Sequence, residues 1–477
     1  MYDVAIIGCG VVGAAVAYEL ARYRVSTVIL EAENDVAAGT TKANSAILHA
    51  GYDPEPGTLM AKLNVRGVVM AEQICRALDV PRRQCGSLVL AFDDADRAHL
   101  QRLLERGHAN GVPGLEILTG AQVRAREPNL SPEVVAALWA PSAAIVSPWE
   151  YALAMAETAV RNGTTLLRSA RVTAARQLSE GWQLDTTAGA VEARFVVNAA
   201  GLGAEAVHNL AAPPAFHTIP TRGEYYLLDK SEGTRVGCTV FPCPTRAGKG
   251  VLVTPTVHGN CLIGPTAEPE REPSTATTAR GLEAVAAAAR RSVPGVDLRA
   301  AIRSFAGVRA VTDRPDFIVE FAAPGFLDLA GIKSPGLSAA PAIGEYAAGL
   351  LAEAGLSLAR RDDFINHRQR LRFRELSPQQ KNDCIRRNAA YGRVICRCET
   401  VTEGEILDCL HTPIPPVSVD GVKRRVNAGM GRCQGGFCGP RVVEILSREL
   451  GLPPEEILQE KAGSRILFGP TKQSREE

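Results

Sequence analysis

Apolar residues in the first thirty positions form two continuous runs on either side of a stretch with a helical pattern. The run at residues 3–8, DVAIIG, has the β-branched character of a buried strand. Residues 14–23, AAVAYELARY, follow as a helix, and residues 25–33, VSTVILEAE, form a second strand that ends on Glu31. The pattern therefore predicts a strand, a turn, a helix and a second strand at the start of the chain.

The order of strand, glycine-containing turn and helix occurs twice more along the chain. Residues 193–207, ARFVVNAAGLGAEAV, contain a buried strand that runs into AAG and the start of a helix. Residues 326–355 contain another strand, a turn rich in Gly and Pro, and a helix. Strand-like runs separated by turn residues are expected at 220–230, 250–266 and 315–321. Amphipathic or alanine-rich helices are expected at 93–106 and 278–291.

Length and charge limit the classes of protein to which the chain can belong. Its 477 residues are too many for one ordinary core and suggest two or three domains. Lys and Arg (53) balance Asp and Glu (52), so neither nucleic acid nor an anionic membrane is expected as a partner. No apolar run reaches the roughly eighteen residues of a membrane span, so no transmembrane segment is expected.

The N-terminus and the cysteine content indicate the compartment. The first residues, MYDVAIIGCG, lack the basic segment and the small-residue cleavage site of a signal peptide. We therefore expect a cytoplasmic protein that associates with a membrane, if at all, through a partner. In that reducing compartment, twelve cysteines are poor evidence for disulfides.

The turn after the first strand has the spacing of a dinucleotide-binding fingerprint. Gly8 allows a tight turn, and Gly13 lets helix and strand pack closely. Gly10 lets the backbone approach a pyrophosphate, and the nearby Val12 is also expected to contact the cofactor. The N-terminus of the following helix offers free N–H groups and a positive dipole end to phosphates. Glu31, eighteen residues after Gly13, stands where a carboxylate can bind ribose hydroxyls.

The loop after Glu31 favours FAD over a nicotinamide cofactor. Residues 37–57, AAGTTKANSAILHAGYDPEPG, are small, rich in hydroxyls and without helical period, which suits them to wrap a phosphate and a flavin ring. A cofactor contacted by three separate strand-to-helix turns is large. The further residues expected to contact it lie in this loop, in the two later turns and, for Val172, elsewhere along the chain: Thr41, Asn44, Ser45, Val172, Ala200, Gly201, Gly331, Lys333, Gly336 and Leu337.

Four cysteines near the end of the chain form two close pairs. Cys396 and Cys398 are spaced C-x-C, and after 34 residues Cys433 and Cys438 are spaced C-x4-C. Helices are expected to begin shortly after each pair, at TEGEILDCL with a capping box and at PRVVEILSREL with Pro in its first turn. Helix N-termini stabilise anionic thiolates and cluster sulfides.

Three interpretations of these cysteines remain open on spacing alone: disulfides, structural zinc and a [2Fe–2S] cluster. The reducing compartment weighs against disulfides. Structural zinc more often uses C-x2-C pairs, and C-x-C would make a strained chelate. Four thiolates are the usual ligands of a [2Fe–2S] cluster. Other cysteines, such as Cys384 and Cys409, are expected to be small apolar core residues.

The fingerprint, TKANSAILHAG, VVNAAGLGA and GIKSPGLSAAPAIG together resemble the D-amino-acid oxidase-like flavoproteins, in the branch of glycerol-3-phosphate and L-2-hydroxyglutarate dehydrogenases. The resemblance spans about residues 1–365 and implies an α/β fold: a discontinuous Rossmann-type FAD domain with an inserted substrate domain of mixed or antiparallel sheet. The implied FAD domain comprises 1–80, 145–215 and 305–365, and the implied substrate domain comprises 81–144 and 216–304.

The C-terminal stretches CRCETVTEGEI and GMGRCQGGFC are similar to the bacterioferritin-associated-ferredoxin-like [2Fe–2S] domain, which relatives carry behind FAD-dependent dehydrogenases. The resemblance implies that Cys396, Cys398, Cys433 and Cys438 hold the cluster, in a small and mainly helical domain. We place this domain at residues 392–455, between an arginine-rich linker at 366–391 and a tail at 456–477. Arg425 and Arg432 would help to offset the negative charge of the cluster.

Two residues are the leading candidates for catalysis. His49 lies in the loop that the family places over the flavin and the substrate, and imidazole titrates in a range that suits proton transfer. Its alternative is a histidine bonded to backbone. Arg309 matches the position where relatives often bind the carboxylate or phosphate of the substrate, which a planar guanidinium holds with two bonds. Its alternative is a surface salt bridge.

Four further polar residues are weaker candidates. Arg222 and Tyr225 begin a predicted strand, where a charged residue often faces water. Lys333 lies in the turn expected to face the flavin pyrimidine, where a cation would stabilise the reduced anionic ring, and a solvated lysine is its alternative. Lys42 has the same two alternatives.

The two halves together indicate an FAD-dependent dehydrogenase with a cluster as its electron exit. A flavin accepts two electrons at once and the cluster carries one, which suits stepwise reoxidation by an electron-accepting protein or a quinone-linked subunit. The expected substrate is a small anion, either a 2-hydroxy acid or glycerol 3-phosphate. The alternatives are an amino-acid or opine-type amine dehydrogenase subunit and an electron-transfer subunit without its own catalysis.

Overall fold

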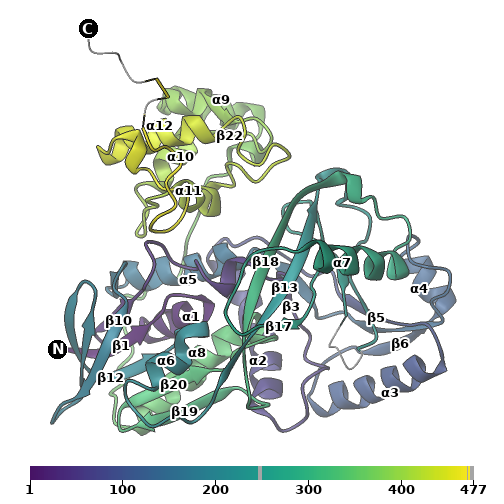
Figure 1. Ribbon diagram of the computed structural model, residues 1–477, viewed down its shortest axis with the longest axis horizontal. Coiled ribbons are helices and arrows are strands. Elements are labelled where there is room, and N and C mark those ends of the chain that lie inside the picture. The colour runs from purple at the N-terminus through teal and green to yellow at the C-terminus, as the bar shows by residue number, and fades with distance from the viewer. Residues whose placement is uncertain (245–249, 470, 473–477) are drawn as a thin grey trace. The chain divides into compact units, whose positions relative to one another are not determined.

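The computed structural model describes residues 1–244, 250–469 and 471–472. The chain divides into two units, of which the larger comprises residues 1–31 and 36–368 and the smaller comprises residues 32–35 and 369–477. Four residues from near the N-terminus therefore pack with the C-terminal part of the sequence. In Figure 1 the helices of the smaller unit, α9 to α12, are those coloured yellow-green to yellow.

Parallel strands form the centre of the first sheet of the larger unit. They are β1 (Tyr2–Ile7), β2 (Thr27–Leu30), β9 (Thr165–Leu167), β12 (Gly189–Asn198) and β20 (Phe326–Ala330). The order β12-β1-β2-β9 places the two N-terminal strands side by side. All of β2 is buried, as expected of a strand covered on both faces. Three antiparallel strands extend the sheet: β10 (Val172–Gln177), β11 (Trp182–Thr186) and β19 (Ile318–Ala323).

Helix α1 (Val11–Leu20) is apolar on nearly all sides because other elements cover it all round. It packs against β1, against α5 (Pro148–Arg161) and against α8 (Gly336–Glu353). Helix α2 (Leu59–Ala77) packs on α8 in turn. The three expected strand–turn–helix units are confirmed as β1–α1, β12–α6 and β20–α8, where α6 spans Ala204–His208.

The second sheet of the larger unit has nine strands in the order β17-β13-β16-β15-β14-β5-β7-β6, with β18 paired to β13. Its longest strands, β13 (Thr218–Leu228) and β18 (Ala301–Thr312), run antiparallel along their whole lengths. The other strands are β5 (Ser87–Ala91), β6 (Glu116–Thr119), β7 (Ala136–Ala140), β14 (Thr239–Pro242), β15 (Leu252–Pro255), β16 (Cys261–Gly264) and β17 (Glu268–Pro269). The strands expected at 220–230 and 250–266 are β13, β15 and β16, whereas the one expected at 315–321 is β19 of the first sheet.

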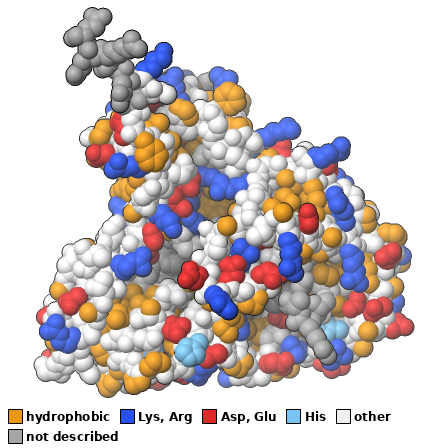
Figure 2. Space-filling model, in the orientation of Figure 1, with side chains coloured by type: hydrophobic (Ala, Val, Ile, Leu, Met, Phe, Trp, Pro, Cys, Tyr) orange, Lys and Arg blue, Asp and Glu red, His pale blue; other side chains and the backbone are white. Residues whose placement is uncertain are grey.

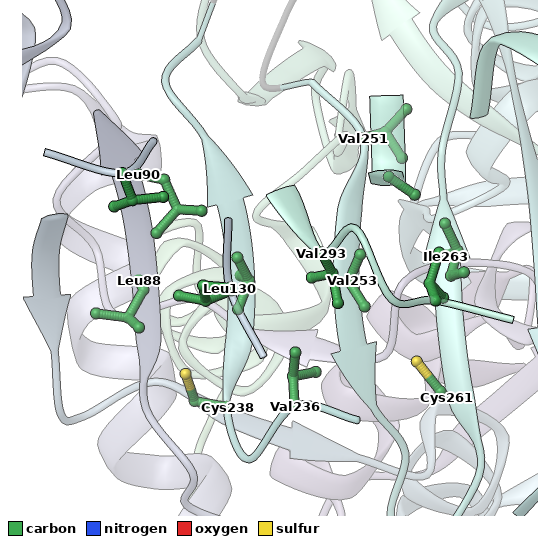
Figure 3. Packing of buried hydrophobic residues seen from close by; sticks show 14 of the residues in the cluster. Leu88, Leu90, Leu130, Val236, Cys238, Val251, Val253, Cys261, Ile263 and Val293 are labelled. Carbon is green, nitrogen blue, oxygen red and sulfur yellow. The ribbon is translucent and has the colours of Figure 1, made fainter. Parts of the chain in front are cut away.

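Apolar side chains point to both faces of β5 in turn, so helices cover both faces of the second sheet. Leu88 and Leu90 point into a core closed by α4 (Gly120–Arg126) and α7 (Ala279–Ser292), where Figure 3 shows them with Val253 and Ile263. Val89, on the opposite face, packs into a second core beneath α3 (Asp94–Ala109). Helices α3 and α7 confirm the two amphipathic patterns in the sequence.

A short third sheet joins the loop after Glu31 to the rest of the larger unit. Strand β3 (Ile47–Leu48) pairs with β8 (Ala144–Val146), which pairs in turn with β4 (Arg82–Arg83). Ile47 and Ile145 pack together with Phe241 and Leu252 of the second sheet. The loop is therefore anchored by strand pairing at its end, next to His49.

The smaller unit is mainly helical. It contains α9 (Pro378–Arg387), α10 (Glu403–Cys409), α11 (Val419–Val426), α12 (Gly439–Leu450) and the strand pair β21 (Val394–Cys396) and β22 (Val401–Thr402). The capping box of α10, formed by Thr402 and Glu405, is confirmed, and Cys438 is the N-cap of α12. Ile406, Val422, Val442 and Leu446 are at the centre of its core.

The stretch expected to be a linker is folded. Residues 369–391 belong to the smaller unit, and Phe373, Cys384 and Tyr391 of this stretch form a small buried cluster. The amide of Phe373 also donates to the Glu405 carboxylate, 3.0 Å away. The domain boundaries proposed from the sequence otherwise stay a prediction.

A buried ionic group ties residues 32–35 into the smaller unit. The carboxylate of Asp35 accepts bonds of 2.9 Å from Arg424 and, with both oxygens, from Arg425. Burial by itself would raise the pKa of Asp35, but the attraction and hydrogen bonds of Arg425 and Arg424 outweigh burial and hold the pKa well below its usual range. Asp35 is fully buried and compensates the guanidinium of Arg425, whereas Arg424 also pairs with Glu460 at 2.8 Å.

We expect Asp35→Asn to lower the unfolding free energy of the smaller unit by about 3–5 kcal/mol, because it takes the carboxylate from the buried guanidinium of Arg425 and leaves that of Arg424 with Glu460 alone. Thermal unfolding followed by circular dichroism and by cluster absorbance would measure the loss. Since the folded-state pKa lies below the ordinary 3.8, this stabilisation is complete above that pH and is lost as the pH falls below it.

The matched control is Asp383→Asn, which breaks the surface pair with Arg386 and should change stability by less than about 1 kcal/mol. Equal unfolding temperatures for the two variants would contradict the importance of the Asp35 group.

Candidate functional site

Because Gly8 and Gly13 have no side chains, the backbone segments at Gly8, Gly13 and Ala199 approach one another closely. A Cβ atom at Gly13 would lie 2.0 Å from the carbonyl oxygen of Gly8, and a Cβ atom at Gly8 would lie 2.7 Å from the carbonyl oxygen of Ala199. Gly8 also has a φ of +94°, which favours glycine. The first and second strand-to-helix turns are therefore in contact, and the cradle fits the pyrophosphate of a dinucleotide.

Glu31 and Thr41 both bond to the backbone of this turn. Oε2 of Glu31 accepts from the amide of Cys9 at 2.7 Å, and Oγ1 of Thr41 accepts from the amide of Val11 at 3.0 Å. Thr41 thus satisfies the first amide of α1 and brings the following loop over the fingerprint. The contact of Glu31 with ribose stays a prediction.

The side chains of Asn44 and Ser45 fix the shape of that loop. Nδ2 of Asn44 donates to the carbonyl of Thr41, and its Oδ1 accepts from the amide of Ala46, both at 2.8 Å. Oγ of Ser45 lies 3.3 Å from the hydroxyl of Tyr225 on β13. The loop therefore spans from the dinucleotide fingerprint to the second sheet.

The ends of β12 and β20 are joined by a buried polar network. Asn198 donates to Oδ1 of Asp328 at 2.7 Å, and Nδ1 of His208 lies 2.5 Å from Oδ2. Burial raises the pKa of Asp328 despite these bonds. Burial lowers the pKa of His208, but bonds to Asp328 and to the carbonyl of Pro213 outweigh it and raise the pKa overall. The network positions Ala200 and Gly201, the next residues of the second turn.

The third turn, between β20 and α8, contains four predicted cofactor residues. Gly331 has a φ of +63°, and its carbonyl accepts from the amide of Lys333 at 2.8 Å. Burial lowers the pKa of Lys333, and the opposing attraction to Asp316 does not outweigh it. Gly336 and Leu337 open α8. Val172, at the start of β10, lies in the same sheet, and its role stays a prediction.

His49 is held at its backbone and left accessible at its ring. Its amide donates to Oγ of Ser338 at 2.7 Å, and its carbonyl accepts from Nδ2 of Asn64 at 3.1 Å. The ring is tilted against Phe241, and Nε2 lies 3.3 Å from Oγ of Ser334. His49 lines a hollow together with Tyr52, Asp53 and Phe241, among other residues.

The guanidinium of Arg309, on β18, lies beside Gly223 of the neighbouring strand β13. One of its terminal nitrogens donates to the carbonyl of Thr266 at 3.2 Å. A Cβ atom at Gly223 would lie 2.8 Å from that nitrogen, so the absence of a side chain there makes room for the guanidinium. The neighbouring carbonyl of Val308 accepts from Oγ1 of Thr40 at 2.7 Å, which brings β18 against the loop.

The weaker candidates differ in their surroundings. Arg222 forms a 2.9 Å ion pair with Glu270 and lies 3.6 Å from Glu224, so two carboxylates already balance its charge. Tyr225 is buried, stacks on Phe305 and faces Ser45. Lys42 ends a short 3-10 helix in the loop.

The four predicted cluster ligands lie as two sulfur pairs. Sγ of Cys398 is 3.7 Å from Sγ of Cys433, and the thiol of Cys396 contacts that of Cys438. Among the described residues, no three His, Cys, Asp or Glu side chains converge as a single metal ion would need. Two separate pairs fit the two irons of a [2Fe–2S] cluster better than one tetrahedral zinc ion.

Arg425 differs from the expectation that it offsets cluster charge. Its guanidinium is buried against the Asp35 carboxylate and the carbonyl of Ile414. Its charge is therefore balanced by Asp35 within the fold. Arg432, in contrast, is exposed beside Cys433.

Sequence reasoning missed Ser338 and Asn64, the two side chains that hold the backbone of His49. Both are fully buried. A usable signal existed for Asn64, since it shares the buried face of α2 with Ala61 and Val68. A polar residue at such a position needs a partner. Ser338 lies in the stretch GIKSPGLSAAPAIG, but only the fold shows that its hydroxyl meets the amide of His49.

No helix in the part of the chain described by the structure is both long enough and apolar enough to cross a membrane. The larger unit shows acidic and basic side chains interspersed on the face drawn in Figure 2. This distribution agrees with the near balance of charge in the sequence.

Two family models match the chain. The model described as FAD dependent oxidoreductase matches residues 3–350, and the model described as BFD-like [2Fe-2S] binding domain matches residues 394–448. The cofactors are therefore FAD and a [2Fe–2S] cluster.

Relatives and solved structures agree with these families. A glycerol 3-phosphate dehydrogenase of Caloramator mitchellensis is 48% identical over 99% of both chains. An L-2-hydroxyglutarate dehydrogenase of Salmonella houtenae is 32% identical over 56% of this chain and 64% of that one. The FAD-bound L-alpha-glycerophosphate oxidase of Mycoplasma pneumoniae superposes with a TM-score of 0.73 at 31% identity, covering 78% of this chain and 98% of that one. The chain belongs to the D-amino-acid oxidase-like family of FAD-dependent oxidoreductases and carries a BFD-like [2Fe–2S] domain behind it.

Proposed function

We propose that this protein is a dehydrogenase that oxidises the secondary alcohol of glycerol 3-phosphate to a ketone and delivers the electrons, through its [2Fe–2S] domain, to an acceptor protein. The observation that carries the proposal is the 48% identity to a glycerol 3-phosphate dehydrogenase over 99% of both chains, so that the likeness includes the cluster domain. The arginine and histidine beside the cofactor loop suit the same reaction.

Arg309 would bind the phosphate of the substrate. Its guanidinium is permanently charged, and one nitrogen is fixed by the carbonyl of Thr266, which leaves its other donors for an anion. Gly223 keeps the space around it open. Binding at a fixed fork would orient the neighbouring alcohol carbon.

His49 would accept the proton of the alcohol at Nε2. Oxidation of CH–OH to C=O removes one hydride from carbon and one proton from oxygen, and the bound FAD supplies the hydride acceptor. The backbone bonds to Ser338 and Asn64 hold His49 while its ring lines the hollow. Ser334, 3.3 Å from Nε2, marks the side on which a hydroxyl group can approach this nitrogen.

L-2-Hydroxyglutarate is the second candidate substrate. It is favoured by the 32% identity to a dehydrogenase of that name and by the ability of one arginine to bind a carboxylate as well as a phosphate. The lower coverage of that relative, 64% of its length, makes it second to glycerol 3-phosphate.

Anaerobic mixing with each candidate tests the proposal directly. Glycerol 3-phosphate should bleach the flavin absorbance near about 450 nm faster than L-2-hydroxyglutarate or any amino acid. Bleaching by L-2-hydroxyglutarate alone would favour the second candidate, and bleaching by an amino acid alone would favour an amine dehydrogenase. Absence of bleaching by all of them would favour a non-catalytic electron-transfer subunit. In air, turnover should produce little hydrogen peroxide, and abundant peroxide would identify an oxidase instead.

We expect His49→Asn to slow flavin reduction by glycerol 3-phosphate by about 10²–10⁴-fold, as is typical when a general base is removed. The pH dependence of that rate should become shallow in the range where imidazole titrates. Stopped-flow absorbance measures both. His108→Asn, which changes an exposed histidine in the last turn of α3, should leave the rate unchanged. A His49→Asn variant that keeps the original pH profile would contradict the role as base.

We expect Arg309→Lys to raise the KM for glycerol 3-phosphate at least about tenfold, because a lysine keeps the charge but loses the planar fork. Steady-state kinetics with an artificial acceptor measures this change. Arg303→Lys, an exposed change on the same strand, is the matched control and should have little effect. If Arg309→Lys and Arg303→Lys had equal KM values, Arg309 would not be the anion-binding residue.

A further inference from the structure

The two sulfur pairs of the cluster site differ in exposure. Cys396 is 1% exposed and Cys438 is 2% exposed, whereas Cys398 is exposed and Cys433 is partly exposed. Two thiolates on one tetrahedral metal with bonds of about 2.3 Å lie about 3.8 Å apart. The 3.7 Å between the sulfurs of Cys398 and Cys433 therefore assigns these two residues to the same iron. Cys396 and Cys438, the buried pair, would hold the other iron.

Exposed arginines and an exposed aromatic ring surround the outer pair. Arg397 precedes Cys398, Arg432 precedes Cys433, and both arginines are exposed. Phe437 is 78% exposed, and its amide donates to the sulfur of Cys433. We define the cluster rim as Arg397, Cys398, Arg432, Cys433 and Phe437.

Exposed acidic side chains are absent from the two segments that form the rim. Within residues 394–400 and 429–440, all of which the structure describes, the exposed charged residues are Arg397 and Arg432. Glu399 is buried, and its carboxylate accepts a 2.8 Å bond from Arg374. The rim therefore presents positive charge and one large apolar side chain.

We propose that the cluster rim is the docking surface for a small acidic protein that carries one electron. This inference rests on the proposed function, in which electrons leave through the cluster domain. An exposed aromatic side chain and two exposed arginines in the same two segments have the composition of an interface hot spot. The arginines also offset the negative charge of a thiolate-bound cluster, which would otherwise repel an acidic partner.

Only one electron is transferred at this surface. The reduced protein loses one electron and the carrier gains it, without proton transfer and without making or breaking a bond. A rim of a few side chains suits a small, transient contact of the kind formed by redox partners. Because such contacts depend on charge between exposed groups, their rates fall steeply with salt.

The test uses two haem proteins of opposite charge, the acidic soluble domain of cytochrome b5 and the basic cytochrome c. The full-length protein is reduced anaerobically with stoichiometric dithionite, so the measurement does not depend on any substrate. Stopped-flow absorbance gives the second-order rate constant for each carrier, and titration calorimetry with the oxidised proteins gives the affinity.

The charge-reversal variant is Arg397→Glu combined with Arg432→Glu. At low ionic strength it should transfer electrons to cytochrome b5 at least about tenfold more slowly and to cytochrome c faster, and it should lose affinity for cytochrome b5. The matched control, Arg386→Glu with Arg387→Glu on α9, makes the same change in net charge outside the two segments that form the rim. It should change either rate less than about twofold.

Phe437→Ala should weaken the affinity for cytochrome b5 about tenfold without changing its salt dependence, since it removes the apolar contact alone. If a variant fails to take up its cluster, the unaltered protein still gives a test. Its rate with cytochrome b5 should fall with added salt, and its rate with cytochrome c should not.

Three results would overturn the proposal: equal rates for the rim variant and the unaltered protein, equal losses in the rim and α9 variants, or the opposite salt dependence. Failure of glycerol 3-phosphate to bleach the flavin would reject the proposed substrate but leave this result intact, because dithionite supplies the electrons.

Discussion

The larger unit depends on the close approach of backbone segments at Gly8. A side chain at Gly13 would collide with the carbonyl of Gly8, and a side chain at Gly8 would collide with the carbonyl of Ala199. Contact between these segments closes the cradle of the dinucleotide and fixes the ends of β1 and β12. The loop that follows Glu31 then attaches to this cradle through Thr41 and delivers His49 to its place beside Ser338.

The smaller unit depends on a different constraint, the burial of charge. Asp35 pairs with Arg424 and Arg425, although 389 and 390 positions separate it from these two adjacent arginines. Asp35 lies only four residues after Glu31, so a short segment next to the second strand of the larger unit supplies a buried charge of the smaller one. The ion pairs of Asp35 with Arg424 and Arg425 explain why residues 32–35 belong with a unit otherwise built from the C-terminal part of the sequence.

Sequence patterns predicted the elements well because local rules govern them. The strands and helices of the three strand–turn–helix units, the capping box at Thr402 and the paired cysteines all follow from short-range spacing. The sequence predicted the bonding partners of polar side chains less well. Arg425 was expected to offset cluster charge and is bound to Asp35 instead, and the support of His49 by Asn64 and Ser338 was missed. These contacts join residues distant in sequence, so no local pattern reveals them.

The central claim is that FAD and the cluster belong to one electron path that begins at the substrate. Anaerobic reduction by excess glycerol 3-phosphate, followed by freezing and electron paramagnetic resonance, tests it most directly. We predict that flavin bleaching is accompanied by the signal of a reduced [2Fe–2S] cluster. A bleached flavin beside a cluster that stays oxidised, although dithionite reduces it, would contradict the account.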